Sequence, residues 1–237
     1  TLAVACARSP RAVAPPPPAP DSVAATAAAV PADTGRPALD RTRPPALGPV
    51  PELRVPPIVE RTLDNGLRVV VVEHHELPVA DVVLVVRTGG EADPAGKPGL
   101  ATLTADLLDE GAGSRSALAI ADQASFLGVR LETGAAWDVS HASLHAPTAQ
   151  LDSALALLGD VVARPTFPVK RERLTGLLQL ADDPQAVADR AFAGLLFGAA
   201  HPYGRPLGGT AAGTRAIARA DVERFWRTHW RPGNATL

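Results

Sequence analysis

Runs of β-branched and alternating apolar residues predict five strands in the region after the N-terminal quarter of the chain. The predicted strands are residues 59–62, 67–72, 79–87, 129–133 and 137–146. The first two are separated by Asp64, Asn65 and Gly66, a sequence typical of a tight hairpin turn. Residues 79–87 are a nearly continuous apolar run, which favours a strand buried on both faces.

Apolar residues spaced three and four positions apart predict helices between and after these strands. The predicted helices are residues 98–110, 116–126, 151–163, 169–181, 184–198, 214–217 and 221–229. Ser116 and Asp221 are suited to cap two of them. In the third, the residues expected to be buried are Leu151, Leu155, Leu158 and Val162. This order predicts an α+β fold: a mostly antiparallel sheet with helices packed on one face.

The N-terminal quarter has a different composition, with fourteen of the 24 prolines lying before Ile58 among many alanines. Such a segment has little apolar surface to bury and is typical of an extended, semi-rigid tether. We therefore expect residues 1–55 to be a disordered Pro/Ala-rich tether that begins with the remnant of a signal sequence. Residues 56–237 carry the periodic apolar patterns and are expected to form the folded domain.

Cys6 is the only cysteine, so no intrachain disulfide is possible. It follows a short apolar stretch of small residues that resembles the end of a bacterial lipoprotein signal, in which the cysteine becomes lipidated. The resemblance implies a lipoprotein of the bacterial cell envelope, periplasmic and anchored to the membrane through Cys6. The alternative is a cysteine without function, in an ordinary secretory signal or a disordered tail.

The predicted helix at residues 98–110 opens with Gly99, Leu100 and Ala101 and is closed by Gly111. It resembles the active-site helix of the insulinase/pitrilysin (inverzincin) peptidases. The next five positions of that helix in the family read His-x-x-Glu-His, two zinc-binding histidines with a general-base glutamate between them. This chain has Thr102, Ala105 and Asp106 at those three positions. The resemblance thus implies the frame of a metallopeptidase with a substituted metal site.

Further segments match the family in order and spacing. They are the hairpin at residues 62–70, the strand at 79–90, Asp183-Pro184, Phe197-Gly198, the loop at 201–206 and the segment at 231–237. Together they extend the resemblance over residues 56–237. It implies the N-terminal domain of the family, one half of a clam-shell repeat, with a C-terminal continuation missing from this chain.

Three other observations bear on a metal site. The family places a third zinc ligand, a glutamate, about seven residues before the Asp-Pro step, and residues 174–179 contain no acidic residue here. Asp106 together with Asp109 or Glu110 could instead hold a hard cation, or they form a solvated helix face. The histidine pairs, His74 with His75 and His141 with His145, are poorly spaced for one ion and are expected to be structural.

The net charge of −2 and the lack of a basic stripe with interleaved aromatics exclude nucleic acid as an expected partner. The resemblance implies a catalytically inactive subunit, without a zinc cofactor of its own, that partners an active zinc peptidase and helps to enclose peptide substrates. Two alternatives stay open. One is an active zinc metalloendopeptidase of the same family, and the other is a lipid-tethered structural envelope protein without a peptidase role.

Overall fold

A computed structural model of the chain describes residues 48, 52, 55–168 and 184–237. The folded unit spans Leu53–Leu237. The predicted tether at residues 1–55 lies almost wholly outside the described residues, as do Cys6 and the predicted helix at 169–181, and all three stay predictions. Within the described part, no helix has the length and apolar character needed to cross a bilayer.

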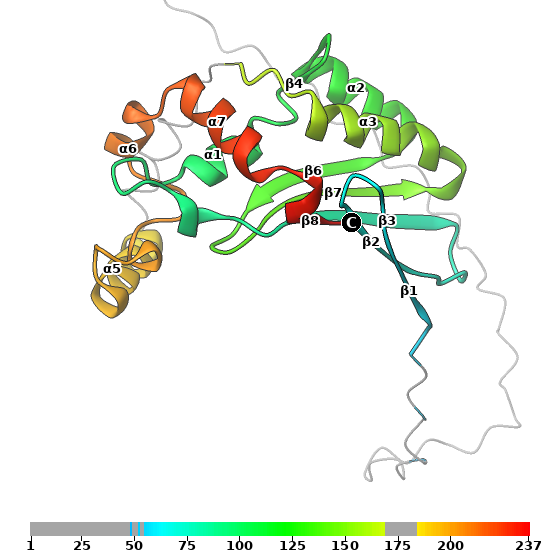
Figure 1. The fold of residues 1–237 in the computed structure, drawn as a ribbon, viewed down its shortest axis with the longest axis horizontal. Coiled ribbons are helices and arrows are strands. Elements are labelled where there is room, and N and C mark those ends of the chain that lie inside the picture. Colours follow the sequence, from blue (N-terminus) through cyan, green and yellow to red (C-terminus); the bar gives the residue numbers. More distant parts are fainter. Residues whose placement is uncertain (1–47, 49–51, 53–54, 169–183) are drawn as a thin grey trace, which may run out of the picture. The chain divides into compact units, whose positions relative to one another are not determined.

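A six-stranded sheet with the order β1-β2-β8-β3-β7-β6 forms the centre of this unit (Figure 1). Its strands are β1 Ile58–Thr62, β2 Arg68–Val72, β3 Val79–Val86, β6 Arg130–Ala135, β7 Ser140–Pro147 and β8 Ala235–Thr236. Every pairing is antiparallel except that of β2 with β8. The short β8 joins the β1–β2 hairpin to the rest of the sheet, since Leu237 N–H donates to the Arg68 carbonyl at 2.8 Å.

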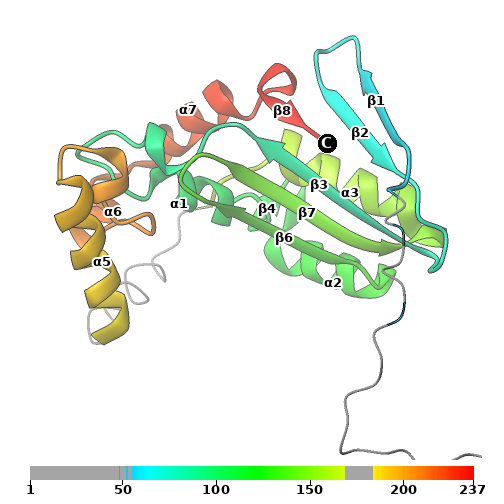
Figure 2. The same cartoon turned by 90° about the horizontal axis from the view of Figure 1, so that it is seen from below.

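The described helices lie mainly on one face of the sheet, as Figure 2 shows for α1, α2 and α3. The helices are α1 Leu100–Asp106, α2 Ala117–Leu127, α3 Leu151–Ala163, α5 Pro184–Phe197, α6 Ala211–Ala216 and α7 Arg219–His229. A small hairpin of β4 Gly111–Ala112 and β5 Arg115–Ser116 separates α1 from α2. The predicted α+β class and helix-covered, mostly antiparallel sheet are confirmed.

The core lies between the sheet and this helical layer. Leu84 and Val86 of β3 and Leu144 of β7 point into it and are buried. The alternate residues of β3 face away from the described helices, and Val83 is 45% exposed. The prediction that residues 79–87 are buried on both faces is therefore wrong, because the described helices cover only one face of this sheet.

Two helix predictions also need correction. Helix α3 has the predicted bounds, but its buried face contains Ala154, Leu157, Leu158 and Val161, whereas Leu155 is 36% exposed. Only Leu158 belongs to both the predicted and the observed buried face, so the core face is rotated from the predicted one. Helix α1 ends at Asp106 rather than residue 110, because the chain leaves the helix after Leu107 and turns into β4.

Of the two predicted N-caps, Ser116 is confirmed and Asp221 is wrong. Ser116 is the N-cap of α2, and its hydroxyl oxygen accepts a hydrogen bond from Ala119 N–H at 3.3 Å. Asp221 does not precede α7 but lies in its first turn, where its carboxylate accepts from Ala218 N–H at 2.8 Å. An acidic residue three positions into a helix can satisfy the backbone in this way, which a search for N-cap residues alone overlooks.

Candidate functional site

Helix α1 is anchored at its start by a buried carboxylate that the sequence reasoning missed. Asp93 accepts hydrogen bonds from Gly99 N–H at 2.6 Å and from Ala101 N–H at 2.8 Å. These are N–H groups that a helix start cannot pair internally. Burial raises the pKa of Asp93 above its ordinary value, and the hydrogen bonds from Ala101 and Gly99 oppose that rise. The residue positions the helix from a loop, so no helical periodicity marks it.

Backbone contact with the segment before α6 fixes the same end of α1. Gly99 has φ 89°, and a Cβ atom there would lie 2.7 Å from Gly209 Cα. A Cβ atom on Gly209 would in turn lie 2.6 Å from the Pro98 carbonyl oxygen. Nearby, Lys97 Nζ pairs with Asp221 Oδ2 at 2.6 Å and ties this loop to α7. The start of α1 is thus built by close packing that only glycine allows.

The three motif positions, Thr102, Ala105 and Asp106, lie on α1 just after this anchor. Thr102 Oγ1 donates to the Leu207 carbonyl at 2.8 Å. Ala105 is fully buried, and Asp106 is exposed at the helix end. Zinc in proteins is bound by imidazole, thiolate and carboxylate groups. A hydroxyl that already donates to a carbonyl, a buried methyl group and one carboxylate do not match that ligand set, so these residues do not fit the family's zinc.

The other candidate ligands are the histidine pairs and the carboxylates at and after the end of α1. Within the described residues, no group of three or more His, Cys, Asp or Glu side chains is arranged to hold a metal ion. His145 Nδ1 instead pairs with Asp81 Oδ1 at 2.7 Å on the exposed face of the sheet. The stretch at residues 174–179, where the family's third ligand is expected, lies outside the described residues.

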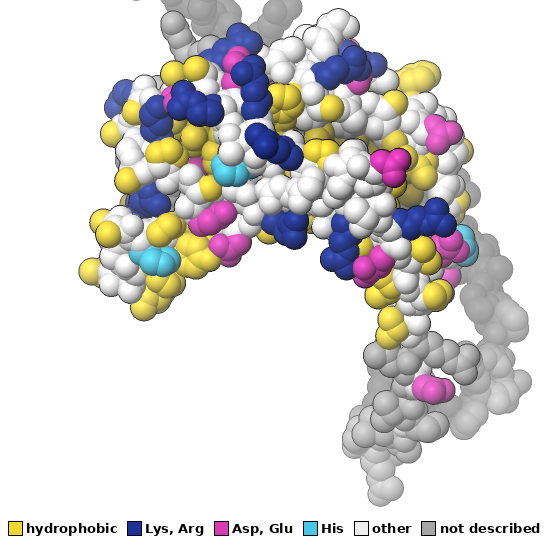
Figure 3. Space-filling model, in the orientation of Figure 1, with side chains coloured by type: hydrophobic (Ala, Val, Ile, Leu, Met, Phe, Trp, Pro, Cys, Tyr) yellow, Lys and Arg dark blue, Asp and Glu magenta, His cyan; other side chains and the backbone are white. Residues whose placement is uncertain are grey.

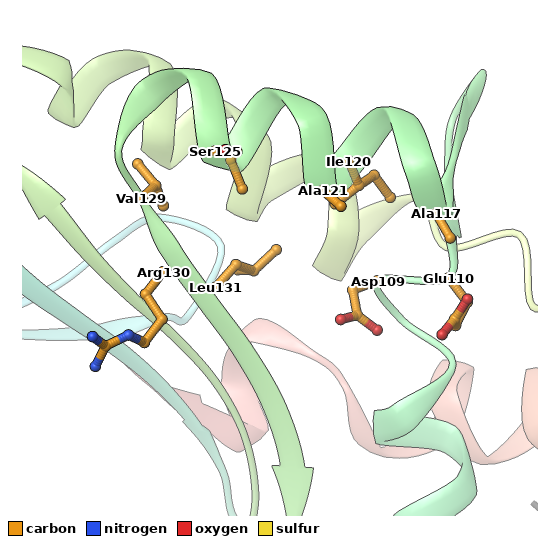
Figure 4. Close-up of a pocket in the computed structure, with 10 residues that line it drawn as sticks. Asp109, Glu110, Ala117, Ile120, Ala121, Ser125, Val129, Arg130 and Leu131 are labelled. Atoms are coloured by element: carbon orange, nitrogen blue, oxygen red, sulfur yellow. The ribbon is translucent and has the colours of Figure 1, made fainter. Parts of the chain in front are cut away.

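An open groove of about 600 Å³ lies between α2 and β6; we call it the α2–β6 groove. It is lined by Asp109, Glu110, Ala117, Ile120, Ala121, Ala124, Ser125, Val129, Arg130 and Leu131. Figure 4 shows Leu131 pointing toward α2, the two acidic side chains on the wall across from β6, and Arg130 pointing away. The sequence predicted Asp109 and Glu110 to be either metal ligands or part of a solvated helix face, and it did not predict the groove, because the groove joins segments that share no motif.

Helix α5 presents a second accessible feature. Hydrophobic side chains gather there in Figure 3, and Phe192, Leu195 and Leu196 are 65%, 87% and 61% exposed. The helix is held at its C-terminal end by an aromatic cluster: Phe197 packs edge-on against Tyr203, whose hydroxyl donates to Asp138 Oδ1 at 2.5 Å. That bond raises the pKa of Tyr203 above its ordinary value. Exposed apolar surface of this kind is typical of an interaction site.

Comparison with known proteins agrees with this architecture. Residues 68–189 match the model of the insulinase family, peptidase family M16. The crystal structure of a peptidase M16 inactive domain from Pseudomonas fluorescens superposes with a TM-score of 0.72 and 30% identity, over 76% of this chain and 45% of that one. The periplasmic protease PqqL of Escherichia coli superposes with a TM-score of 0.67 and 20% identity, over 76% of this chain and 21% of that chain.

A curated relative from Mycobacterium leprae, described as an uncharacterized zinc protease, is 29% identical over 181 residues. The match covers 74% of this chain and 40% of that protein, so the chain spans about two fifths of the relative's length. An α+β sheet with its helices on one face and a glycine-anchored α1 defines one half of a clam-shell peptidase unit. The chain belongs to the insulinase family, peptidase family M16, as its motifs predicted.

Proposed function

We propose that this chain is a non-catalytic M16 domain that binds peptides for an active zinc peptidase of the same family. The observation that carries the proposal is the state of the three motif positions. The anchor that holds α1 is fully built, while Thr102 is bonded to Leu207 and the Ala105 side chain is inaccessible. A helix that keeps its position but offers no zinc ligand set supports a structural role in a peptide-binding protein.

The proposed partner is an active subunit or domain that carries His-x-x-Glu-His and its own zinc. Support comes from the solved relative described as an inactive M16 domain, which is similar to this chain at 30% identity. The exposed apolar residues of α5 provide surface for such an association. Because the chain covers 45% of that relative, further M16 sequence is expected to complete the unit.

For location, we propose the periplasm, with the domain held at the membrane by a lipid on Cys6 and separated from it by the Pro/Ala-rich segment. A structural relative described as a periplasmic protease supports the compartment. Mass spectrometry of the protein expressed with its signal tests the anchor. A diacylglycerol on Cys6, lost in Cys6→Ser, is expected, and an unmodified cysteine in membrane fractions would contradict it.

Zinc content and activity test the central proposal. The purified chain, and the chain co-expressed with a His-x-x-Glu-His homologue, are analysed for zinc and for hydrolysis of an unstructured fluorogenic peptide. We expect no stoichiometric zinc and no hydrolysis from the chain alone, and both from the complex. The alternative, an active zinc peptidase, is supported by the relative that is described as a zinc protease. About one chelator-removable zinc per chain, with hydrolysis, would establish an active peptidase instead.

A further inference from the structure

We propose that the α2–β6 groove is a specificity pocket for one lysine or arginine side chain of an extended peptide lying along β6. This inference rests on the peptide-binding function proposed above. It adds a chemical preference that neither the motif positions nor the family match supplies.

The first step is the position of the groove beside a sheet edge. Among the described strands, β6 pairs only with β7, so its other edge presents backbone N–H and C=O groups to an added strand. Side chains of an added strand alternate between the two faces of the sheet. Leu131 of β6 points toward α2 in Figure 4, so every second peptide side chain would point to the side of the sheet on which the groove lies, and the one beside the start of β6 would enter it.

The second step is the chemistry of the groove walls. Ile120, Ala121 and Leu131 form an apolar surface between α2 and β6. Asp109 and Glu110 lie on the turn after α1, across the groove from Leu131. The one cationic residue of the lining, Arg130, points away from them (Figure 4). A long side chain with an apolar stem and a cationic end matches this combination, because the stem covers apolar surface while the charge reaches carboxylates.

The two carboxylates, Asp109 and Glu110, can bind a peptide cation even though they already interact with other groups of the chain. An ionised carboxylate has about four acceptor positions, so a peptide cation can join an existing arrangement. An acidic peptide side chain would be repelled at the same place, and a neutral one would gain only the apolar contact.

Binding of matched peptides to the full chain tests the proposal. The probe is a short labelled peptide of alternating threonine and valine with one central arginine, followed by fluorescence anisotropy. The comparison peptide has glutamine at the centre. At low salt we expect the arginine peptide to bind about tenfold more tightly, and the difference to shrink as ionic strength rises. Equal binding of both peptides would overturn the cation preference while leaving peptide binding intact; no binding of either would overturn the proposed function itself.

Variants then locate the preference. The double variant Asp109→Asn, Glu110→Gln is expected to reduce the difference between the peptides to about twofold or less. Asp122→Asn, at an exposed position on α2 outside the groove, is expected to keep it. Persistence of the full arginine preference in the double variant would rule out the groove as its source.

A second pair of variants does not alter charge. Ala121→Phe fills the groove from an exposed position of α2, and Ala119→Phe adds the same bulk at an exposed position of that helix outside the lining. We expect at least a fivefold loss of arginine-peptide binding for the first alone, since the added ring occupies the space that the side-chain stem needs. Thermal melts of both variants check the fold, and equal binding by the two would contradict the proposed location.

Discussion

The start of helix α1 keeps the contacts that fix its position, whereas the motif positions after it lack the family's zinc-binding side chains. At the start, Asp93 pairs two backbone N–H groups, and Gly99 packs on Gly209 at a distance that excludes any side chain. Toward the end, Thr102 donates to a carbonyl, Ala105 is buried and Asp106 faces solvent. The start is fixed by close packing and hydrogen bonds, and the three motif positions after it offer no zinc ligand set.

A family motif combines residues that the fold requires with residues that the reaction requires, and helix α1 separates the two. The glycines and the buried aspartate hold the helix against the sheet and the segment before α6, and the fold needs them whether or not a reaction takes place. The metal-binding side chains serve only the reaction, so they can be replaced without loss of the fold. A family match over residues 68–189 therefore establishes the scaffold and leaves the activity to be tested.

The largest effect is expected where the replaced chemistry is restored. Ala105→Glu places a carboxylate at a fully buried position and should lower the free energy of unfolding by about 3 to 5 kcal/mol. Urea denaturation followed by circular dichroism measures it. Ala119→Glu, at an exposed position of α2, is the control and should change stability by less than about 0.5 kcal/mol. A stable Ala105→Glu variant would mean that the motif face can reopen toward a metal site.

The next largest effect tests the start of the helix. Gly99→Ala combines a positive φ with a Cβ atom 2.7 Å from the Gly209 backbone, and should cost about 2 to 4 kcal/mol. Two glycines provide matched controls. Gly113→Ala has a positive φ without a close contact and isolates the backbone strain, while Gly96→Ala has neither. We expect the denaturation midpoint to be lowest for Gly99→Ala, intermediate for Gly113→Ala and highest for Gly96→Ala. Equal midpoints for Gly99→Ala and Gly96→Ala would refute the packing argument.

The sequence predicted the scaffold well because its signals are local. The turn at Asp64-Asn65-Gly66, the N-cap Ser116 and the bounds of α3 follow from neighbouring residues and were confirmed. The errors concern relations between elements. Which face of α3 is buried depends on its packing against β7 and α2, and the residues of the helix alone do not fix it.

The candidate site was predictable only in part. The resemblance of the helix after Gly99 to the active-site helix of the family identified Thr102, Ala105 and Asp106, because all three lie in one continuous segment of the chain. Asp93 acts from outside the helix through backbone groups, and the groove beside β6 is formed by α2, a strand and the turn after α1. Such features arise from tertiary packing, which periodicity along the chain does not encode.

A smaller effect, dependent on pH, is expected where the loop before α1 is tied to α7. Pairing with Lys97 and the hydrogen bond from Ala218 hold the pKa of Asp221 below its ordinary value of 3.8. A lowered pKa in the folded state adds stability above the unfolded value and loses it as the pH falls through the folded value. Asp221→Asn should therefore cost about 1 kcal/mol at pH 7 and progressively less below pH 3.8. A difference from the unsubstituted protein that stays constant down to pH 2 would contradict the ion pair.

The smallest effect is expected at the exposed motif position. Asp106→Asn removes one charge from the solvent-facing end of α1 and should change the free energy of unfolding by no more than about 0.5 kcal/mol, because water screens the interactions of an exposed charge. Denaturation midpoints in low and high salt measure the change, with Asp122→Asn on α2 as a control of matched chemistry. Together with a large loss in Gly99→Ala, this result would place the structural constraint on α1 at its start. A loss above about 2 kcal/mol would instead show that Asp106 is part of the scaffold, and the contrast between the two ends of the helix would no longer hold.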